Sequence, residues 1–508
     1  MKRAIQNWFI FYTALLISPL SLADAYSDPF QVSIFSSDIL SNRMHVSANG
    51  DTMISWYQGE GAARTTYMQR YDSLGRVLQA QPWNLGKYAN NMALSPSGSF
   101  SLLTSKFDGD GNGVFLTTYD RNGGLLINER LVNNSRIGNQ KPSAIEINDN
   151  NHMVIAWVKE GPGFEKSLYL KSYPANGAAS TEILIHTMTQ EYDYFGAVDI
   201  GIDNLGNFVI AWDAGNFHTT NWKEVYSQRF DVNGNALSGI TQVNSYMIGG
   251  QDQTKIAMNG NGDYVIVWES NTPEDTTRDA VYSQRYNAAG IAQGGITRIS
   301  NTESGIDGFN IDMDQNGGFV LTWIGKKDPT INYSSRETLL RGFDRNGIPN
   351  SDVMVVSNST NIHPIIPAVG INKDGNFMIS WMQTSFISNQ PSYIYARRYS
   401  PSGTSIQPLV NGQTKTGLNG GTASWQYFKV TVPVGHTTLD TAIFGGTGDA
   451  DVYVRYANLP TLNTWDARPY RAGNNETARI TGIPAGEWYI GIYGFSAYSG
   501  LSLQSSSF

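Results

Sequence analysis

The chain contains no cysteine in its 508 residues, and this absence excludes several kinds of chemistry. Thiol nucleophiles, cysteine-ligated metals and disulfides are impossible, so stability must come from burial and hydrogen bonding. Charged residues are also scarce, at 15% of the chain, and no cluster of lysine and arginine stands out. We therefore expect no nucleic-acid partner. The net charge of −8 mainly supports solubility.

Motifs of common hydrolases are missing as well. The chain has six histidines, and none lies in a His-Glu-x-x-His pattern, which excludes the usual metalloprotease helix. No Gly-x-Ser-x-Gly elbow lies between a strand and a helix. The Ser-x-Asp-x-Gly-x-Thr-Trp pattern of sialidase blades does not match either, because tryptophan here follows the turn by six residues instead of three. We therefore assign no catalytic residue.

The N-terminus has the pattern of a secretory signal peptide. Lys2 and Arg3 precede an apolar stretch at 8–22, and Ala-Asp-Ala at 23–25 supplies small residues for cleavage. A membrane anchor is the alternative, but the stretch is short and contains Pro19. No later stretch is apolar enough to span a bilayer. We predict a signal peptide at 1–25 and a secreted or periplasmic mature protein with no membrane span.

One sequence motif occurs seven times in the chain. It consists of a turn, an alternating apolar run and an anchor residue six positions after the turn. Six anchors are tryptophan, and they lie 48 to 58 residues apart when the second copy's threonine is included. The anchors are Trp56, Thr104, Trp157, Trp212, Trp268, Trp323 and Trp381. A period of this size is typical of stacked or radial copies of one unit. Repetition at a fixed offset from a turn indicates packing, so we expect the anchors to be core residues.

The fifth copy shows how many strands each repeat contains. Runs at 255–258, 264–268, 280–286 and 295–299 are rich in Val, Ile and Tyr and are separated by Gly and Asn turns. Four antiparallel strands repeated seven times predict an all-β, seven-bladed β-propeller over 26–404. A linear β-solenoid is the alternative, but its coils are shorter and its strands parallel. The stretch 29–33 resembles 241–245, and we expect it to be the strand that closes the ring.

The pattern changes after Gly403, and alternating runs predict a small antiparallel, jelly-roll-like β-sandwich over 405–508. The motifs are 424–433, Gly-Asp-Ala-Asp-Val-Tyr at 448–453, Trp-Asp-Ala-Arg-Pro-Tyr at 465–470 and 484–494. In this order they closely resemble the bacterial pre-peptidase C-terminal (PPC) domain, a β-sandwich of many exported proteins. Family members often carry a cysteine pair where this chain has Ala467 and Ala478. The preceding repeats are similar to tandem repeats of large secreted bacterial proteins, a resemblance tied to no one activity.

The segments after the anchors join equivalent strands, so all should emerge on one face of the propeller. Rigid scaffolds commonly bind ligands through such loops. The fourth copy is richest in aromatic side chains, which stack on sugars or anchor proteins. The alternative is ordinary solvated loops. The predicted ligand-binding residues are Asp213, Phe217, His218, Trp222 and Glu269.

Two acidic segments are candidate calcium sites. The first contains Asp108, Asp110 and Asn112, with oxygen ligands at alternate positions, but position twelve is Tyr119 where a calcium loop has glutamate. The second contains Asp449 and Asp451. In both segments a plain turn is the competing interpretation.

Together these patterns predict an exported, monomeric, non-catalytic binding or adhesion protein for an extracellular polysaccharide or protein. The PPC-like part would aid surface retention or export. The alternative is a carbohydrate-active glycosidase or lyase with acids on one propeller face. A third interpretation makes the C-terminal part a removable propeptide. Calcium is the one cofactor considered.

Overall fold

The computed structural model describes residues 22–508 except 26–28, 34–38, 40, 48, 60, 73–76, 176–177, 220–222, 246–248, 271–279, 301–305, 307, 326–335, 350–351, 358–361, 374, 386–391, 402–405, 422–423, 458, 461, 463–464 and 470. Most of the predicted signal peptide lies outside this part. The elements are strands, apart from one 3-10 turn, and the all-β prediction is confirmed. Among the described residues no helix is long and apolar enough to cross a membrane.

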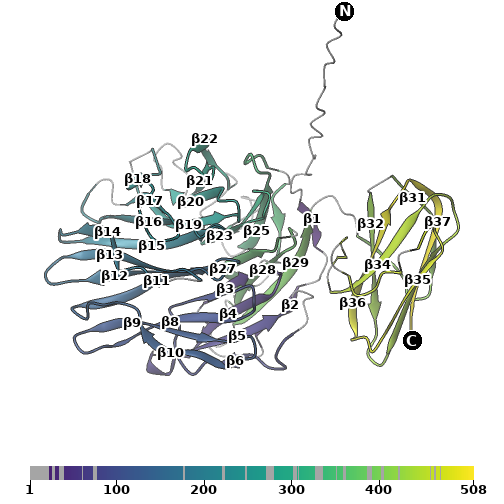
Figure 1. Cartoon of the computed structure of the whole chain (residues 1–508), viewed down its shortest axis with the longest axis horizontal. Helices are drawn as coiled ribbons and strands as arrows, with labels where there is room; N and C mark the ends of the chain where they lie inside the picture. The colour runs from purple at the N-terminus through teal and green to yellow at the C-terminus, as the bar shows by residue number, and fades with distance from the viewer. Residues whose placement is uncertain are drawn as a thin grey trace, which may run out of the picture.

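Seven sheets, here called blades, follow one another along the chain (Figure 1). Blade 1 contains β3 (Arg43–Val46), β4 (Thr52–Gln58), η1 (Gly61–Ala63), β5 (Thr65–Tyr71) and β6 (Trp83–Asn84). Blade 2 contains β7 (Asn91–Leu94), β8 (Phe100–Phe107), β9 (Asn112–Tyr119) and β10 (Leu125–Leu131). Blade 3 contains β11 (Asn139–Ile147), β12 (Met153–Glu160), β13 (Lys166–Tyr173) and β14 (Ile183–Met188). Blade 4 contains β15 (Asp193–Ile202), β16 (Phe208–Asn216), β17 (Glu224–Phe230) and β18 (Thr241–Gln242).

The last three blades follow the same plan. Blade 5 contains β19 (Gln251–Met258), β20 (Tyr264–Ser270), β21 (Ala280–Tyr286) and β22 (Ala292–Arg298). Blade 6 contains β23 (Phe309–Met313), β24 (Phe319–Gly325), β25 (Glu337–Phe343) and β26 (Met354–Val355). Blade 7 contains β27 (Ile362–Ile371), β28 (Phe377–Ser385) and β29 (Tyr393–Pro401), joined by β1 (Leu22–Ala25) and β2 (Phe30–Gln31) from the N-terminus.

The blades form a closed ring. Their first strands contact one another in the cyclic order β3, β7, β11, β15, β19, β23, β27 and back to β3. Blade 7 takes its outer strand from the start of the chain, because β2 pairs with β29 through Phe30 opposite Ala396 and Gln31 opposite Tyr395. The expected closing strand is therefore confirmed. Because the ring is closed, each blade packs against a neighbouring blade on both of its faces.

The anchors form the core between blades. All six tryptophans are almost completely buried. Trp157 of blade 3, for example, packs against Leu103 and Val114 of blade 2. The turn six residues earlier has a left-handed backbone, with φ of 61° at Asn151 and 87° at Gly206. Glycine and asparagine tolerate this conformation, which explains their recurrence. The prediction that the anchors are core residues is confirmed.

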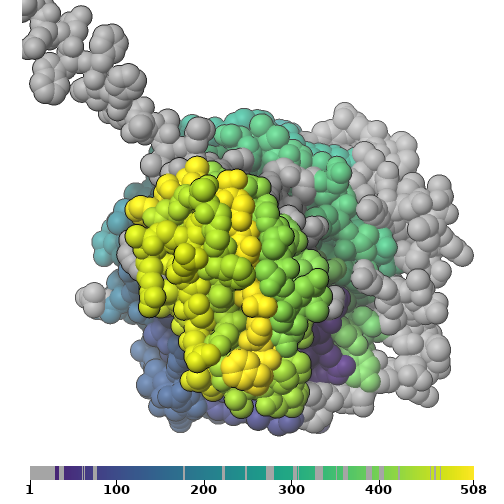
Figure 2. Space-filling view, turned by 90° about the vertical axis from the view of Figure 1, so that its right-hand side faces the viewer, coloured from purple at the N-terminus to yellow at the C-terminus, as the bar shows by residue number. Residues whose placement is uncertain are grey.

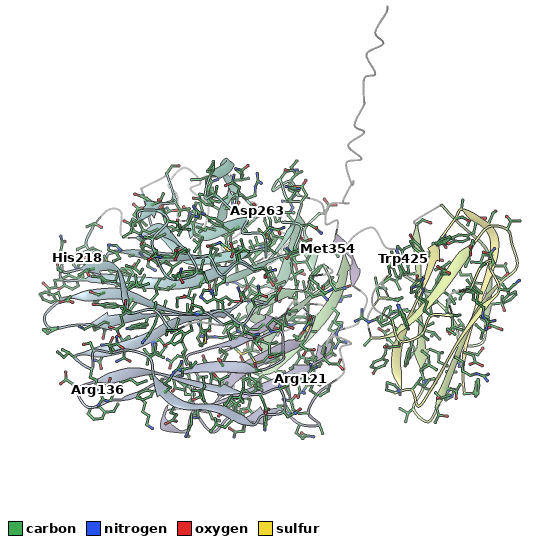
Figure 3. The ribbon with its side chains drawn as sticks, in the orientation of Figure 1. Arg121, Arg136, His218, Asp263, Met354 and Trp425 are labelled. Atoms are coloured by element: carbon green, nitrogen blue, oxygen red, sulfur yellow. The ribbon has the colours of Figure 1, made fainter. Side chains whose placement is uncertain are left out.

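The ring has two ends. The loops between second and third strands, together with the connections from one blade to the next, emerge at one end, here called the loop face. The tight turns between first and second strands, and between third and fourth strands, lie at the other end, here called the turn face. Figure 3 shows Arg136 and His218 of the loop face at the end of the propeller away from the C-terminal strands. Figure 2, in which the right-hand side of Figure 1 faces the viewer, shows those strands in front of the propeller.

The C-terminal strands form two four-stranded sheets. One contains β30 (Ile406–Pro408), β32 (Trp425–Val432), β36 (Gly486–Gly494) and β34 (Ala450–Tyr456). The other contains β31 (Thr414–Gly420), β37 (Tyr498–Ser507), β33 (Thr438–Phe444) and β35 (Glu476–Thr481). Side chains of both sheets, including Val430, Ile443 and Ile490, share one apolar cluster, as in a β-sandwich.

Candidate functional site

The loop face of blade 4 carries a buried carboxylate. Asp213, on β16, has no exposed surface. Its Oδ2 accepts hydrogen bonds from the backbone N–H groups of Ala197 at 3.0 Å and Thr254 at 3.2 Å, so it joins blades 4 and 5. Residue 196 must be glycine here, because a Cβ would lie 1.8 Å from Asp213 Oδ1. The backbone of β15 is thus shaped around this carboxylate.

Lys223 provides the opposite charge. Its Nζ lies 3.6 Å from Asp213 Oδ1 and 2.9 Å from Asp252 Oδ2, and it sits 5.0 Å from the ring centroid of Tyr194. Burial raises the pKa of Asp213 to about 6, although Lys223 opposes the shift. Burial disfavours the ammonium as well, but Asp213 and Asp252 outweigh this and raise the pKa of Lys223. The cluster is therefore a linked acid–base group under the loop face.

Aromatic side chains lie on this cluster. The Phe217 ring stacks on Tyr194 with centroids 3.8 Å apart and planes 7° apart. His218 packs against Tyr192 with centroids 4.1 Å apart. Tyr192, Phe217 and His218 are exposed, whereas Tyr194 is only partly exposed. We call Tyr192, Tyr194, Phe217 and His218 the aromatic shelf.

The structure thus brings together three of the five predicted ligand-binding residues: Asp213, Phe217 and His218. Glu269 lies on β20 of blade 5, buried and hydrogen-bonded by Gln253 Nε2. Trp222 lies outside the described residues. Two shelf residues, Tyr192 and Tyr194, were missed by the sequence analysis. The available signal was the Tyr-x-Tyr spacing at the start of blade 4, where Tyr192 directly precedes β15 and Tyr194 is the second residue of that strand.

A polar channel of about 590 Å³ runs between the first strands of the blades. Glu146, Asp199 and Asp312 line it. Burial, then the neighbouring Asp199 and Asp312, raise the pKa of Glu146 to about 8. Burial raises the pKa of Asp312 to about 7 even though its carboxylate accepts backbone hydrogen bonds. Glu146 therefore favours its neutral form near neutral pH.

Two of the channel acids also join neighbouring blades. Asp312 Oδ2 accepts a 2.8 Å hydrogen bond from the N–H of Ile371, and Asp199 Oδ2 accepts a 3.2 Å bond from the N–H of Ile256. The inner edge of each first strand has no further strand beside it, so these carboxylates satisfy edge groups that would otherwise need water. Their arrangement indicates an architectural role.

The predicted calcium residues take part in local contacts. Asp108 Oδ2 accepts from Asn133 Nδ2 at 3.3 Å, and Asp110 Oδ2 from Gly138 N at 3.4 Å. Asn112 donates its backbone N–H to Asn139 Oδ1 at 3.2 Å. These contacts fit the interpretation of the segment as an inter-strand turn.

The same holds in the sandwich. Asp449 Oδ1 accepts from Gly473 N at 2.9 Å, and Asp451 Oδ2 lies 3.8 Å from Arg468 Nη2, a cation supplied by the chain itself. Within the described part of the chain, no group of three or more acidic or histidine side chains is arranged to hold a metal. Calcium at Asp449 and Asp451, or at Asp108, Asp110 and Asn112, stays a prediction.

Comparison with known proteins identifies the C-terminal part. Residues 426–494 match the family "Bacterial pre-peptidase C-terminal domain", so the chain carries a PPC domain near its C-terminus. Alkaline serine exoprotease A of Vibrio alginolyticus is 41% identical over 98 residues, which are 19% of this chain and 18% of that protein. The similarity is therefore confined to a small part of that relative's length.

Two solved structures are similar to this chain. A solution structure titled vEP C-ter 100 is 37% identical, covers 19% of this chain and 96% of that chain, and has a TM-score of 0.18. The crystal structure of the polysaccharide lyase Uly1 covers 76% of this chain and 98% of that chain, with 11% identity and a TM-score of 0.45.

Proposed function

We propose that this chain is an exported, non-catalytic binding protein that holds an extracellular polysaccharide or protein on the loop face of blade 4. The aromatic shelf is the observation that carries this proposal. Flat rings exposed on a rigid base bind sugar faces or anchor protein partners at small entropic cost. Asp213, Lys223 and Asp252 provide the rigid base, because they fix Tyr194 and the two neighbouring blades.

Burial of the acids favours binding over catalysis at this site. A general acid or base must come within hydrogen-bond reach of the substrate. Asp213 has no exposed surface, its Oδ2 accepts two backbone hydrogen bonds and its Oδ1 faces Lys223 Nζ at 3.6 Å. Glu269 is buried beside Gln253. A glycosidase would need a carboxyl pair open to a sugar. Asp213 therefore acts in this proposal as a positioning residue under the shelf.

We further propose how the rest of the chain serves this role. Residues 1–25 are a signal peptide that is removed on export, residues 26–404 form the binding propeller, and residues 405–508 form the PPC domain. The pattern of the N-terminus and the PPC match near the C-terminus support this division. The PPC domain would aid export or surface retention, and the mature protein would be a monomer.

The test is a glycan and matrix-protein array probed with mature protein 26–508. We expect a ligand whose binding is lost in a Tyr192→Ala, Phe217→Ala double variant and kept in Leu205→Ala. Leu205 is a suitable control because it is an exposed apolar residue on the turn face. An array without any ligand would contradict the proposal. New reducing ends or unsaturated sugars released from a polysaccharide panel would favour the enzyme alternative instead.

A further inference from the structure

A groove of about 580 Å³ lies on the loop face between blades 2 and 3. It is formed by three segments: the β8–β9 loop, the connection from β10 to β11 and the β12–β13 loop. The segments contribute Asp110, Ile137, Glu160, Glu165 and Lys166, and the β12–β13 loop adds the Gly-Pro-Gly run at 161–163. The groove is a recess beside the aromatic shelf on the next blade.

Exposed apolar side chains continue across three consecutive blades. Phe107 of blade 2 is 68% exposed, Ile137 on the connection to blade 3 is 58% exposed, and Phe164 of blade 3 is 54% exposed. On blade 4, Tyr192 is 50% and Phe217 58% exposed. We call these five residues the apolar strip. Single exposed apolar residues are ordinary, but a succession on adjacent loops of one face is typical of a binding surface.

The loops that carry the strip are tied to one another. The N–H of Asn112 donates to Asn139 Oδ1 at 3.2 Å, which joins blades 2 and 3. Lys166 Nζ donates to the backbone carbonyl of Asp193, which joins blades 3 and 4. A surface held in this way is preorganised, so little ordering entropy is lost when a ligand binds.

Four basic side chains near the strip have partners within the chain; two of these side chains contact carboxylates and two contact backbone carbonyls. Lys141 Nζ lies 2.5 Å from Glu160 Oε1, and Arg136 Nη1 donates to the carbonyl of Asp108 at 3.1 Å. Lys166 is bound to Asp193, and Lys223 lies between Asp213 and Asp252. A sugar carboxylate or sulfate would meet cations that already have partners, and it would also face Asp110 and Glu165. The strip is therefore complementary to a ligand without charge.

We propose that the apolar strip binds an extended, uncharged polysaccharide chain across blades 2 to 4, with the groove beside Phe164 taking one stretch of it. This inference rests on the proposed function and names its ligand class. Apolar side chains separated by polar loops suit successive sugar rings, whereas a protein interface would place them in one contiguous core. Because the strip crosses three blades, a polymer could contact all of its residues at once.

Affinity electrophoresis of mature protein in native gels tests the proposal. The gels contain mixed-linkage β-glucan or galactomannan as uncharged polymers, and alginate or polygalacturonate as anionic ones. We expect retardation in at least one uncharged gel, unchanged by added salt because no ion pair with the ligand is involved. Phe164→Ala and Phe107→Ala should each weaken binding roughly tenfold, and Leu205→Ala should leave it unchanged.

Three outcomes would overturn the inference. The first is retardation in anionic gels only. The second is binding that depends on Tyr192 and Phe217 but is unchanged in both Phe164→Ala and Phe107→Ala, and this would leave the proposed function standing. The third is a protein ligand on the array with no polysaccharide bound. If neither the array nor the gels reveal a ligand, both proposals are contradicted. Thermal melts of each variant distinguish lost contacts from lost folding.

Discussion

At the scale of single residues, the acids of the channel lower the free energy of unfolding by an amount that depends on pH. Glu146 lies between Ile145 and Ile147, and Asp312 lies between Ile311 and Met313, so each acid has an apolar residue on either side. Neither acid was among the residues predicted from the sequence. A charge between two apolar neighbours was the available signal, because such a position must either contact a partner or face a polar cavity.

The first prediction concerns this pH dependence. In the folded state the pKa of Glu146 is about 8 and that of Asp312 about 7, both raised by burial, whereas in the unfolded chain they return to 4.5 and 3.8. Unfolding at pH 5 to 8 therefore releases protons, so the free energy of unfolding falls as pH rises through this range. A Glu146→Gln, Asp312→Asn variant should lose this slope and gain on the order of 2 kcal/mol at pH 8.

Denaturant titrations at pH 5, 6.5 and 8 measure the effect. The matched control is Asp440→Asn, because the pKa of Asp440 is lowered by its hydrogen bond with Arg479 and its contribution has the opposite sign. An equal slope for wild type and the double variant between pH 5 and 8 would contradict the prediction.

A second residue-scale prediction concerns Ala467 and Ala478 of the PPC domain. Ala478 belongs to the apolar cluster of the sandwich, and Ala467 packs against the same cluster. Related domains often have cysteines at these positions. We expect an Ala467→Cys, Ala478→Cys variant to form a disulfide and to gain roughly 3 kcal/mol, the chain-entropy value for a short enclosed loop.

Free-thiol titration and thermal melts with and without reductant check this result. Each single cysteine variant serves as its own control for the change in packing. Two titratable thiols in the folded, oxidised double variant would show that the positions are not placed for a disulfide.

At the scale of elements, arginines of the third strands fasten one blade to the next. Arg70 of β5 is almost fully buried, and its guanidinium donates to the carbonyls of Gly98 and Arg121 in blade 2. Arg229 of β17 donates to the carbonyls of Ala288 and Ala289 in blade 5, each at 2.6 Å, in an exposed setting. Both arginines therefore have a structural role between neighbouring blades.

These two arginines form a matched pair for the third prediction. Arg70→Met leaves two carbonyls without a donor in a buried place, so we expect a loss of about 3 kcal/mol in the free energy of unfolding. Arg229→Met should lose less than about 1 kcal/mol, since water replaces the exposed bonds. Equal losses in chemical denaturation would show that burial of the guanidinium does not decide its contribution.

At the scale of the whole molecule, the ring depends on β2, near the N-terminus of the chain. Val32 N donates to the carbonyl of Ile394 at 2.8 Å, and Ser33 Oγ accepts from Ile394 N at 3.0 Å, next to the pairing of β2 with β29. Val32 and Ile39 also belong to the apolar cluster between blades 7 and 1. A short N-terminal segment thus joins two blades that are far apart in sequence.

The fourth prediction compares two truncations. Removal of residues 1–25 deletes β1 only, and we expect a small change in melting temperature. Removal of residues 1–40 deletes β2 and the residues that pack beside it, and it should cost on the order of 5 kcal/mol through lost burial and lost backbone hydrogen bonds. Calorimetry of both proteins measures the difference; coincident melts would mean that the ring does not need this strand.

The sequence by itself determined the strands, the turns and the anchors. Alternation with a period of two and a left-handed turn residue such as Asn151 are local properties. They can therefore be identified without knowing which blades lie beside a repeat. The PPC domain was also recognisable, because its motifs lie within one short stretch of chain.

Only the tertiary structure decided which side chains share a surface. Phe217 and His218 were predicted from their loop, but their partners lie at the start of blade 4, where Tyr192 directly precedes β15 and Tyr194 belongs to it. Asp213 is buried although it lies only four residues before the exposed ring of Phe217. Contacts between blades determine this burial, since the neighbouring blade supplies Thr254 N to the carboxylate. Exposure is thus a property of the closed ring, and it cannot be calculated from the local pattern of one repeat.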